Sequence, residues 1–167
     1  MGDAMLTGLL SRQTCAMCRK CCVFGRYDVL NTPVLNSEVR QKTERLLPEA
    51  RFLSKGEASW LFRMEVPRED GMFTCPLLHS ENGCMLGDEK PFTCRIWPVQ
   101  IMDVNGRLAI TVSPLCEAIA ALPLGTLLRF VKTQLAEEIF SYADAHPDEV
   151  QSYDGLSPVL VWKPQKI

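Results

Sequence analysis

Eight cysteines constrain this 167-residue sequence more than any other feature. Four of them fall within eight positions near the N-terminus, where the run Cys-Ala-Met-Cys-Arg-Lys-Cys-Cys repeats a two-residue spacer. Cysteines with this spacing can hold three corners of an iron–sulfur cluster, because a tight turn points their thiolates at one centre. We therefore treat all the cysteines as candidate metal ligands. They are Cys15, Cys18, Cys21, Cys22, Cys75, Cys84, Cys94 and Cys116.

The expected cellular location bears on what these thiols do. Residues 1–10 have no lysine or arginine before their short apolar run, and no small-residue cleavage site follows, so the sequence predicts no secretory signal. We expect a cytoplasmic protein, in which stable disulfides are not the default and metal is the usual explanation for many cysteines. No stretch approaches the roughly 18 apolar residues of a membrane span. The net charge of −2 offers no basic excess for binding nucleic acid.

An iron–sulfur cluster, [4Fe–4S], and a zinc ion are the two candidate cofactors. Bacterial ferredoxins combine such a run with a fourth cysteine followed by proline, and proline follows Cys75 here. A structural zinc site usually takes two pairs of ligands with short spacers. Cys15 and Cys18 form one such pair, but the later cysteines form none. The cluster is our leading hypothesis and zinc the alternative, and we expect His79 and His146 to be ordinary surface residues rather than further ligands.

Two details of the cysteine cluster bear on the number of metal centres and on their charge. Adjacent side chains normally diverge, so Cys21 and Cys22 are not expected to bind one metal ion. Either each binds a different metal centre, or one is a ligand and the other packs in the protein without binding metal. Eight thiols could fill two four-cysteine sites, and the spacing leaves one or two centres open. Arg19, Lys20 and Arg95 flank cysteines, where they either offset the negative charge of a thiolate cluster or are solvated surface cations. Arg95 is our candidate cofactor-binding residue outside the cysteines.

Other functional classes match the sequence less well. A dithiol redox protein would carry the same Cys-x-x-Cys pair, but the βαβ context of thioredoxin is missing. Cys18 and Cys22 have the first spacing of a radical-SAM motif, but no cysteine follows at the second spacing and the chain is too short for the barrel. The sequence contains no glycine-rich phosphate loop, nucleophile elbow or metalloprotease helix. We therefore predict no catalytic residues and favour a non-enzymatic role.

Hydrophobic patterning predicts an α+β fold with short hairpins and a cysteine-rich metal-binding core flanked by helices. Asn36 or Ser37 can cap a helix that ends near Leu47. Alternation with a period of two predicts a half-buried strand over 60–66, and a returning strand follows over 72–78 after a turn.

Two Asn-Gly pairs predict turns, at 82–83 and 105–106. The second pair lies between two alternating apolar runs, 100–104 and 107–112, which is the strongest short-range signal for a β-hairpin. The segment 159–162 either adds a short strand or packs as an extended segment.

A helix is also predicted after the last cysteine. Thr126 can cap it, and Pro147 lies beyond its end. We treat 1–167 as a single domain, with 15–116 as the cysteine-cluster metal-binding region and 117–146 as the C-terminal helical region. The expected apolar stripe, which we assign to the core, consists of Leu128, Val131, Leu135, Ile139 and Tyr142.

These motifs together resemble those of a known family. Residues 15–22 resemble the opening of the YkgJ-type cysteine-cluster family, a domain named for its CxxCxxCC pattern and for chelation of zinc or iron. Cys75 and Cys84 are similar to its middle pair, and Cys116 fits its last cysteine. Residues 90–98, Lys-Pro-Phe-Thr-Cys-Arg-Ile-Trp-Pro, closely resemble its Arg-Pro-x-x-Cys-Arg-x-aromatic-Pro signature.

The resemblance covers residues 15–116 and implies metal chelation by the cysteines rather than a reaction. Lys90 stands where the family usually has arginine, and no glycine lies within 18–21. Some larger members attach this module to a flagellin lysine methylase, which implies an alternative role as an accessory factor or enzyme that modifies a partner protein. Our leading function is a metal-thiolate protein with a structural, electron-transfer or redox-sensing role. A structural zinc module that binds a protein partner is the other alternative.

Overall fold

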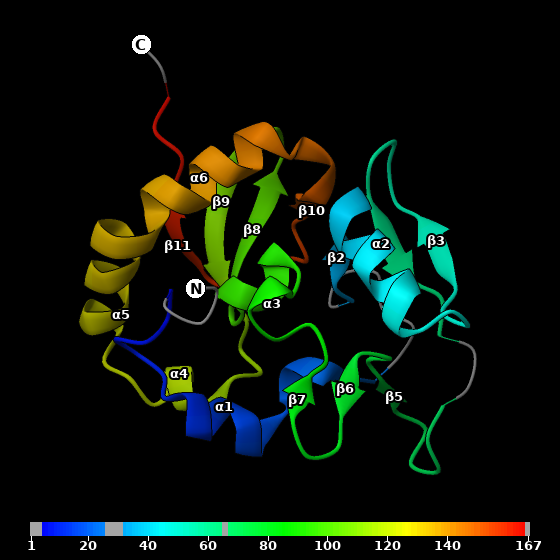
Figure 1. Cartoon of the computed structure of the whole chain (residues 1–167). Coiled ribbons are helices and arrows are strands. Elements are labelled where there is room, and N and C mark those ends of the chain that lie inside the picture. The colour runs from blue at the N-terminus through cyan, green and yellow to red at the C-terminus, as the bar shows by residue number, and fades with distance from the viewer. Residues whose placement is uncertain (1–4, 26–31, 65–66, 166–167) are drawn as a thin grey trace.

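A computed structural model describes residues 5–25, 32–64 and 67–165, and Figure 1 shows their arrangement. Helices and strands are both present along the chain, which confirms the predicted α+β fold. A sheet crossed by a long helix forms one side of the molecule, and a smaller sheet with helix α2 forms the other. The segments that carry the cysteines lie along the lower edge and the centre in this view.

The largest sheet is built around the predicted Asn-Gly hairpin. Strands β8 (Val99–Val104) and β9 (Arg107–Val112) pair antiparallel. Both turn residues, 105–106, have positive φ, 54° and 84°, as a type I′ turn requires. The predicted terminal strand is confirmed as β11 (Val159–Trp162), which pairs antiparallel with β9, while β10 (Gln151–Ser152) pairs parallel with β8. The strand order is β10-β8-β9-β11.

One long helical segment crosses this sheet over β8 and β9 (Figure 1). It consists of α5 (Leu124–Phe130), a π-helical turn (Val131–Leu135) and α6 (Ala136–Ala145). It begins before the predicted cap Thr126, because the preceding proline presets a helical φ of −57°. It ends before Pro147, as predicted.

The buried face of this helical segment differs slightly from the predicted stripe. Leu128 and Tyr142 are only half-buried, whereas the three central residues of the stripe are buried. Burial recurs every four residues, a spacing that drifts by about 40° per turn around an ideal α-helix. The π-helical turn has more residues per turn and so returns the later side chains to the sheet. The buried positions at this spacing are Leu127, Val131, Leu135, Ile139 and Ala143.

A second sheet with helix α2 forms the other side of the molecule. The strands β2 (Val34–Leu35), β4 (Trp60–Phe62) and β3 (Phe52–Ser54) pair antiparallel in the order β2-β4-β3. Helix α2 (Ser37–Leu46) begins at the predicted cap, since the side-chain oxygen of Asn36 accepts a backbone N–H of the first turn at 3.0 Å. The helix predicted for this part of the chain is therefore confirmed.

The returning strand predicted over 72–78 does not pair with the strand predicted over 60–66. Only the first part of the latter is a strand, β4, and residues 65–66 lie outside the described part of the chain. Both edges of β4 are already paired, with β2 and β3, so it has no edge left for another strand. β5 (Phe73–Thr74) pairs instead with β1 (Val23–Phe24), directly after the N-terminal cysteines.

The chain between the two middle cysteines forms a hairpin of its own. Pro76 has no backbone N–H for a ladder, so β5 ends before it. β6 (Leu78–His79) then pairs antiparallel with β7 (Gly83–Cys84), which confirms the turn predicted from the first Asn-Gly pair. Gly83 has a φ of 76°, a conformation that glycine adopts without steric cost.

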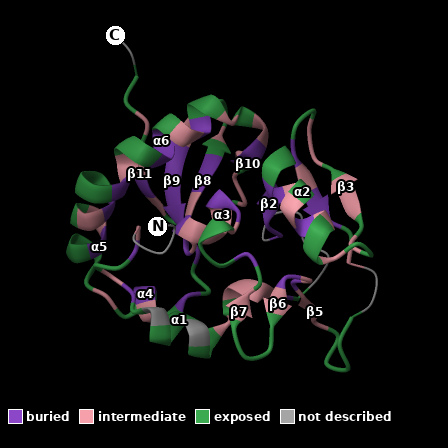
Figure 2. Ribbon diagram, viewed as in Figure 1, coloured by how far each residue is buried: buried purple, intermediate pink, exposed green. Residues whose placement is uncertain are grey.

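The remaining elements are short, and most of them carry or adjoin cysteines. Figure 2 shows buried residues concentrated in β8, β9 and β2, whereas α1 and the β6–β7 hairpin are mostly exposed or half-buried. No helix in the described ranges is both long and apolar enough to span a bilayer. The short helices are α1 (Arg12–Cys18), α3 (Phe92–Ile96), α4 (Glu117–Ala120) and the 3₁₀ turns Lys20–Cys22, Gly87–Glu89 and Pro147–Glu149.

Candidate metal centre

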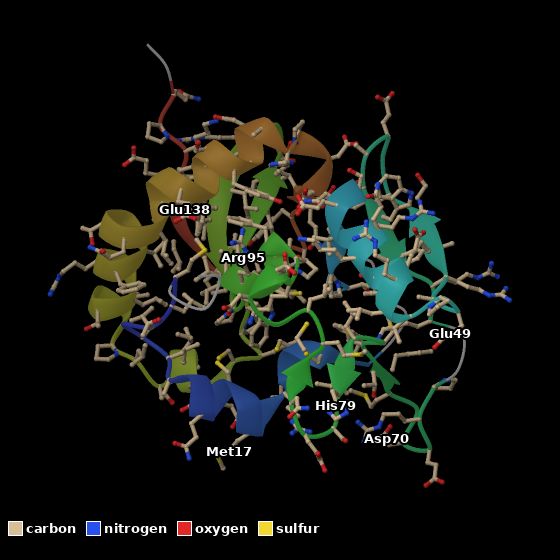
Figure 3. The ribbon with its side chains drawn as sticks, in the orientation of Figure 1. Met17, Glu49, Asp70, His79, Arg95 and Glu138 are labelled. Atoms are coloured by element: carbon tan, nitrogen blue, oxygen red, sulfur yellow. The ribbon has the colours of Figure 1, made fainter. Side chains whose placement is uncertain are left out.

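All the cysteines predicted as metal ligands line a single cavity of about 300 Å³. It lies among α1, α3, α4 and the β6–β7 hairpin, and Figure 3 shows sulfur atoms gathered between these elements. The eight thiols are all free, with no disulfide among them. Segments far apart in the sequence therefore bring their cysteines to one place.

Helix α1 positions the first two cysteines of the run. Ser11 caps the helix by accepting the backbone N–H of Thr14 at 3.1 Å. Arg19 ends it in the left-handed conformation, with a φ of 51°. Cys15 and Cys18 lie three residues apart on α1, so they share one face of the helix, and both are exposed. The sequence does not predict this helix, because its residues show no apolar stripe at helical spacing.

The next two cysteines lie in the 3₁₀ turn after α1 and are half-buried. The sulfur atoms of Cys21 and Cys22 are 3.8 Å apart, so the expectation that these adjacent side chains diverge is wrong. The tight turn that carries them brings their sulfurs together. A hydrogen bond with Cys22 raises the pKa of Cys21, and burial raises it further. Two thiolates on one tetrahedral zinc, with bonds of about 2.3 Å, would also lie about 3.8 Å apart.

Backbone amides face both sulfur atoms of the β6–β7 region. Burial raises the pKa of Cys75 to about 12, and the N–H of Leu77 acts against this rise. Burial also raises the pKa of Cys84, where the N–H groups of Leu86 and Gly87 act against it. Amide donors of this kind stabilise negative charge on sulfur, as iron–sulfur sites require. The chain after each of these cysteines turns back so that its amides point at the sulfur.

Cys94 occupies the first turn of α3, where its N–H bonds the carbonyl of Pro91 at 2.9 Å. Burial raises its pKa well above the ordinary value, and the thiols of Cys75, Cys21 and Cys84 raise it further. Cys94 therefore faces thiols from both the N-terminal run and the hairpin. A cluster of protonated thiols is favoured until a metal displaces the protons.

Cys116 immediately precedes α4, is buried, and lines the same cavity. Burial raises the pKa of Cys15, and the thiols of Cys21, Cys116 and Cys18 raise it further. An ion pair between Lys20 and the first residue of α4 joins the 3₁₀ turn to this part of the chain. Because the ion pair is exposed, it contributes little to stability, and its main effect is to hold the 3₁₀ turn next to α4.

Four cations also line the cavity. Arg19, Lys20 and Arg95, which the sequence placed beside cysteines, all reach it, together with Lys90. Lys90 acts against the raised pKa of four thiols. The guanidinium of Arg95 lies 5.2 Å from the ring of Phe92, and its buried Nε has no hydrogen-bond partner among the described residues. Positive charge and a spare donor suit an anionic thiolate centre.

The thiols share a cavity without forming a ready-made coordination site. Within the described residues, no three cysteine, histidine, aspartate or glutamate side chains converge closely enough to hold a metal ion. Metal sites of this kind are seldom preformed, because binding must draw the ligands together and remove their protons. The exposed position of α1 leaves it room to make such an adjustment.

Neither histidine lies at this cavity. His79 is exposed on the hairpin, where its Nδ1 accepts the N–H groups of Glu81 and Asn82 at 3.2 and 3.3 Å. His146 ends α6 and stacks on Tyr142, with ring centroids 4.2 Å apart. Both histidines therefore lie away from the cavity that the thiols line.

Lys90 is a charged residue of this cavity to which the sequence motifs assign no role. The sequence marks Lys90 only as a departure from the family signature and does not indicate that its charge offsets that of the thiolates. Its position shortly before Cys94 was the signal, because a basic residue close to a cysteine in sequence can offset thiolate charge.

Comparisons with family models, with curated proteins and with solved structures found no match. The cysteine motif and the geometry of the cavity are therefore the observations on which a functional argument can stand.

Proposed function

We propose that this protein binds an iron–sulfur cluster, [4Fe–4S], in the cavity lined by its cysteines. The observation that carries this proposal is that all eight thiols, contributed by separate segments between residues 15 and 116, lie on one cavity. Such a cluster takes four cysteine thiolates, which this set supplies. When bound, the cluster would cross-link the cysteine-bearing segments and provide a one-electron redox centre.

The surroundings of the thiols support an anionic centre. Amide N–H groups face Cys75 and Cys84, and the cations Lys90 and Arg95 lie on the same cavity. These residues would balance cluster charge and orient the sulfurs. The α1 side of the site is exposed, which suits electron transfer or redox sensing as well as a structural role.

Zinc is the second candidate, and one distance favours it. The 3.8 Å separation of the Cys21 and Cys22 sulfurs matches two ligands of a tetrahedral zinc ion. In that case the protein would be a structural zinc module that presents a surface to a protein partner.

The family resemblance and the location are part of the same proposal. We assign the chain to the YkgJ-type cysteine-cluster family on its motifs, and we place it in the cytoplasm because eight free thiols suit a reducing compartment. The same family motifs supply no catalytic residue.

The test is anaerobic purification followed by a visible absorption spectrum and elemental analysis for iron, sulfide and zinc. A brown protein with equal amounts of iron and sulfide supports the cluster. Cys94→Ser should lose that colour, whereas Met17→Ala, on the exposed side of α1, is the matched control that should keep it. A colourless wild-type protein that contains zinc would overturn the cluster and leave the zinc module.

A further inference from the structure

The molecule has two separate hydrophobic cores, and we call the parts built around them the large lobe and the small lobe. The large lobe consists of the β10-β8-β9-β11 sheet and the helices packed on it, and the small lobe consists of α2 and the strands β1 to β7. No described strand of one lobe pairs with a strand of the other. The chain passes between the lobes at residues 11–21 and 87–91, and both passages contribute residues to the thiol cavity. The cavity therefore lies where the chain itself joins the lobes.

Both lobes contribute thiols to this cavity. Cys75 belongs to the core of the small lobe, and Cys84 packs against that core. Cys94 lies on α3, which packs into the core of the large lobe through Phe92 and Ile96. The distances between the thiols of one lobe and those of the other therefore depend on how the two lobes are held.

Packing between the lobes is incomplete beside the thiol cavity. A second cavity of about 40 Å³ lies between them, and its walls include Pro33 from the small lobe and Thr93, Gln100 and Gln151 from the large lobe. Parts of a chain move relative to one another unless the interface between them is large and hydrophobic. A further contact is therefore needed to fix the position of the lobes.

Hydrogen bonds between two turns supply such a contact, in the upper half of Figure 1 and away from the cysteine-bearing segments. They join the turn between β3 and β4 to the 3₁₀ turn before β10 and the residue that follows it. Nζ of Lys55 donates to the carbonyls of Asp148 and Val150 at 2.7 and 2.9 Å. The N–H of Ala58 donates to Oδ2 of Asp148 at 2.8 Å, and Oγ of the buried Ser59 donates to its carbonyl at 3.0 Å. We call this contact the latch.

The two turns of the latch also approach each other closely. A Cβ added at Gly56 would lie 2.9 Å from Oδ2 of Asp148, which is too close for the carboxylate to keep its position. Beside the latch, a side-chain hydrogen bond between Asn36 and Tyr142 spans the same interface. The latch is therefore a specific fit between the lobes rather than a single exposed pair.

We propose that the latch fixes the relative position of the two lobes and of the thiols they contribute, so that Lys55 is a positioning residue for the candidate metal site. One half-buried side chain bonds two carbonyls of the opposite lobe. A metal bound at the cavity would join the lobes at a different place, so the metal and the latch stabilise the same arrangement and are thermodynamically coupled. This inference rests on the proposed function, since it takes the cavity to bind a metal.

The experiment uses the full chain, labelled with ¹⁵N, metal-free and reduced. Residual dipolar couplings give the orientations of the β8–β9 hairpin and of the β2-β4-β3 sheet, and competition with a coloured chelator gives the affinity for zinc. Lys55→Met removes both bonds of Nζ and keeps a long side chain. Gly56→Ala forces the Asp148 carboxylate to shift without removing a charge. Lys163→Met is the matched control, because Lys163 pairs with Asp144 inside the large lobe.

We expect one rigid orientation to fit both sheets in the wild type and in Lys163→Met. Lys55→Met and Gly56→Ala should need a separate orientation for each sheet, and their zinc affinity should fall at least about fivefold. Saturating zinc should restore a single orientation. Should Lys55→Met not fold, Gly56→Ala decides alone.

One shared orientation in the latch variants would overturn the proposal, because a residue that only stabilises its own turn would not uncouple the lobes. Separate orientations in the wild type would overturn it as well. Separate orientations in the variants with unchanged zinc affinity would refute the positioning role. A wild type that binds neither zinc nor an iron–sulfur cluster would refute the proposed function and the positioning role with it, while separate orientations in the variants would still support the latch.

Discussion

Tyr142 links the long helical segment to α3, the helix that carries Cys94. Its ring stacks on Phe92, the first residue of α3, with ring centroids 3.6 Å apart. Its hydroxyl donates to Oε2 of Glu149 at 2.8 Å, and Glu149 is only 4% exposed. The other carboxylate oxygen, Oε1, is buried without a hydrogen-bond partner among the described residues, and Nδ1 of His146 lies 3.5 Å from it. Tyr142→Phe therefore keeps the aromatic stack and removes the main donor to a buried carboxylate.

The cost follows from the kind of hydrogen bond that is lost. Hydrogen bonds to charged groups contribute about 1.5–3 kcal/mol, and a buried acceptor without its partner costs a similar amount. We expect Tyr142→Phe to lower the free energy of unfolding by about 2–3 kcal/mol. The matched control is Tyr153→Phe, because Tyr153 donates to the neutral carbonyl of Ser157 at 3.1 Å. That substitution should cost about 0.5–1.5 kcal/mol.

Guanidinium denaturation of the two variants and the wild type, followed by far-UV circular dichroism, measures both costs. The slope of the transition should stay unchanged if only stability changes. A Tyr142→Phe cost no larger than that of Tyr153→Phe would refute the argument, since the buried carboxylate would then not depend on this donor.

Three further outcomes are expected. Ile139→Ala, at a position with 0% exposure, should lower the free energy of unfolding by about 2–5 kcal/mol in the same denaturation assay, and a cost below about 1 kcal/mol would contradict its central packing. Gly106→Ala should lower the free energy of unfolding by about 1–2 kcal/mol through its φ of 84° alone, since no atom lies within 4 Å of the added Cβ. Gly125→Ala in α5 should be neutral or stabilising, and equal effects of the two substitutions would contradict the turn assignment. The metal-free protein should lose stability as the pH rises from about 8.5, where an unfolded thiol ionises, toward about 12. The raised pKa of Cys75 keeps the proton on the folded chain over this range, while the unfolded chain releases it. A melting temperature that rises over the same range would contradict this prediction.

The elements predicted correctly from the sequence are those whose signal is local. Asn36 caps α2 by a side-chain bond within its own first turn, and the pair at 105–106 sets both its dihedral angles and the register of the hairpin. Each of these signals lies within a few residues of the structure it specifies, so no knowledge of distant segments is needed.

The errors arose where distant segments decide the outcome. Of the strand predicted over 72–78, only residues 73–74 form a strand, β5. It pairs with β1 because β4 has no free edge. The distance between the Cys21 and Cys22 sulfurs depends on a 3₁₀ turn that the sequence pattern does not predict. Likewise, which cysteines face one another depends on how α1, α3 and the hairpin pack, and spacing along the chain carries no such information.

Burial sets the chemistry of several of these thiols before any metal binds. Thiolates, not thiols, react with oxidants and metals, so a raised pKa makes a buried cysteine slow to react. Burial raises the pKa of Cys75 and Cys94, which protects these two thiols from oxidation in the free protein. Metal loading of these buried thiols must therefore overcome the burial that protects them, and the amides and cations around the sulfurs reduce that cost.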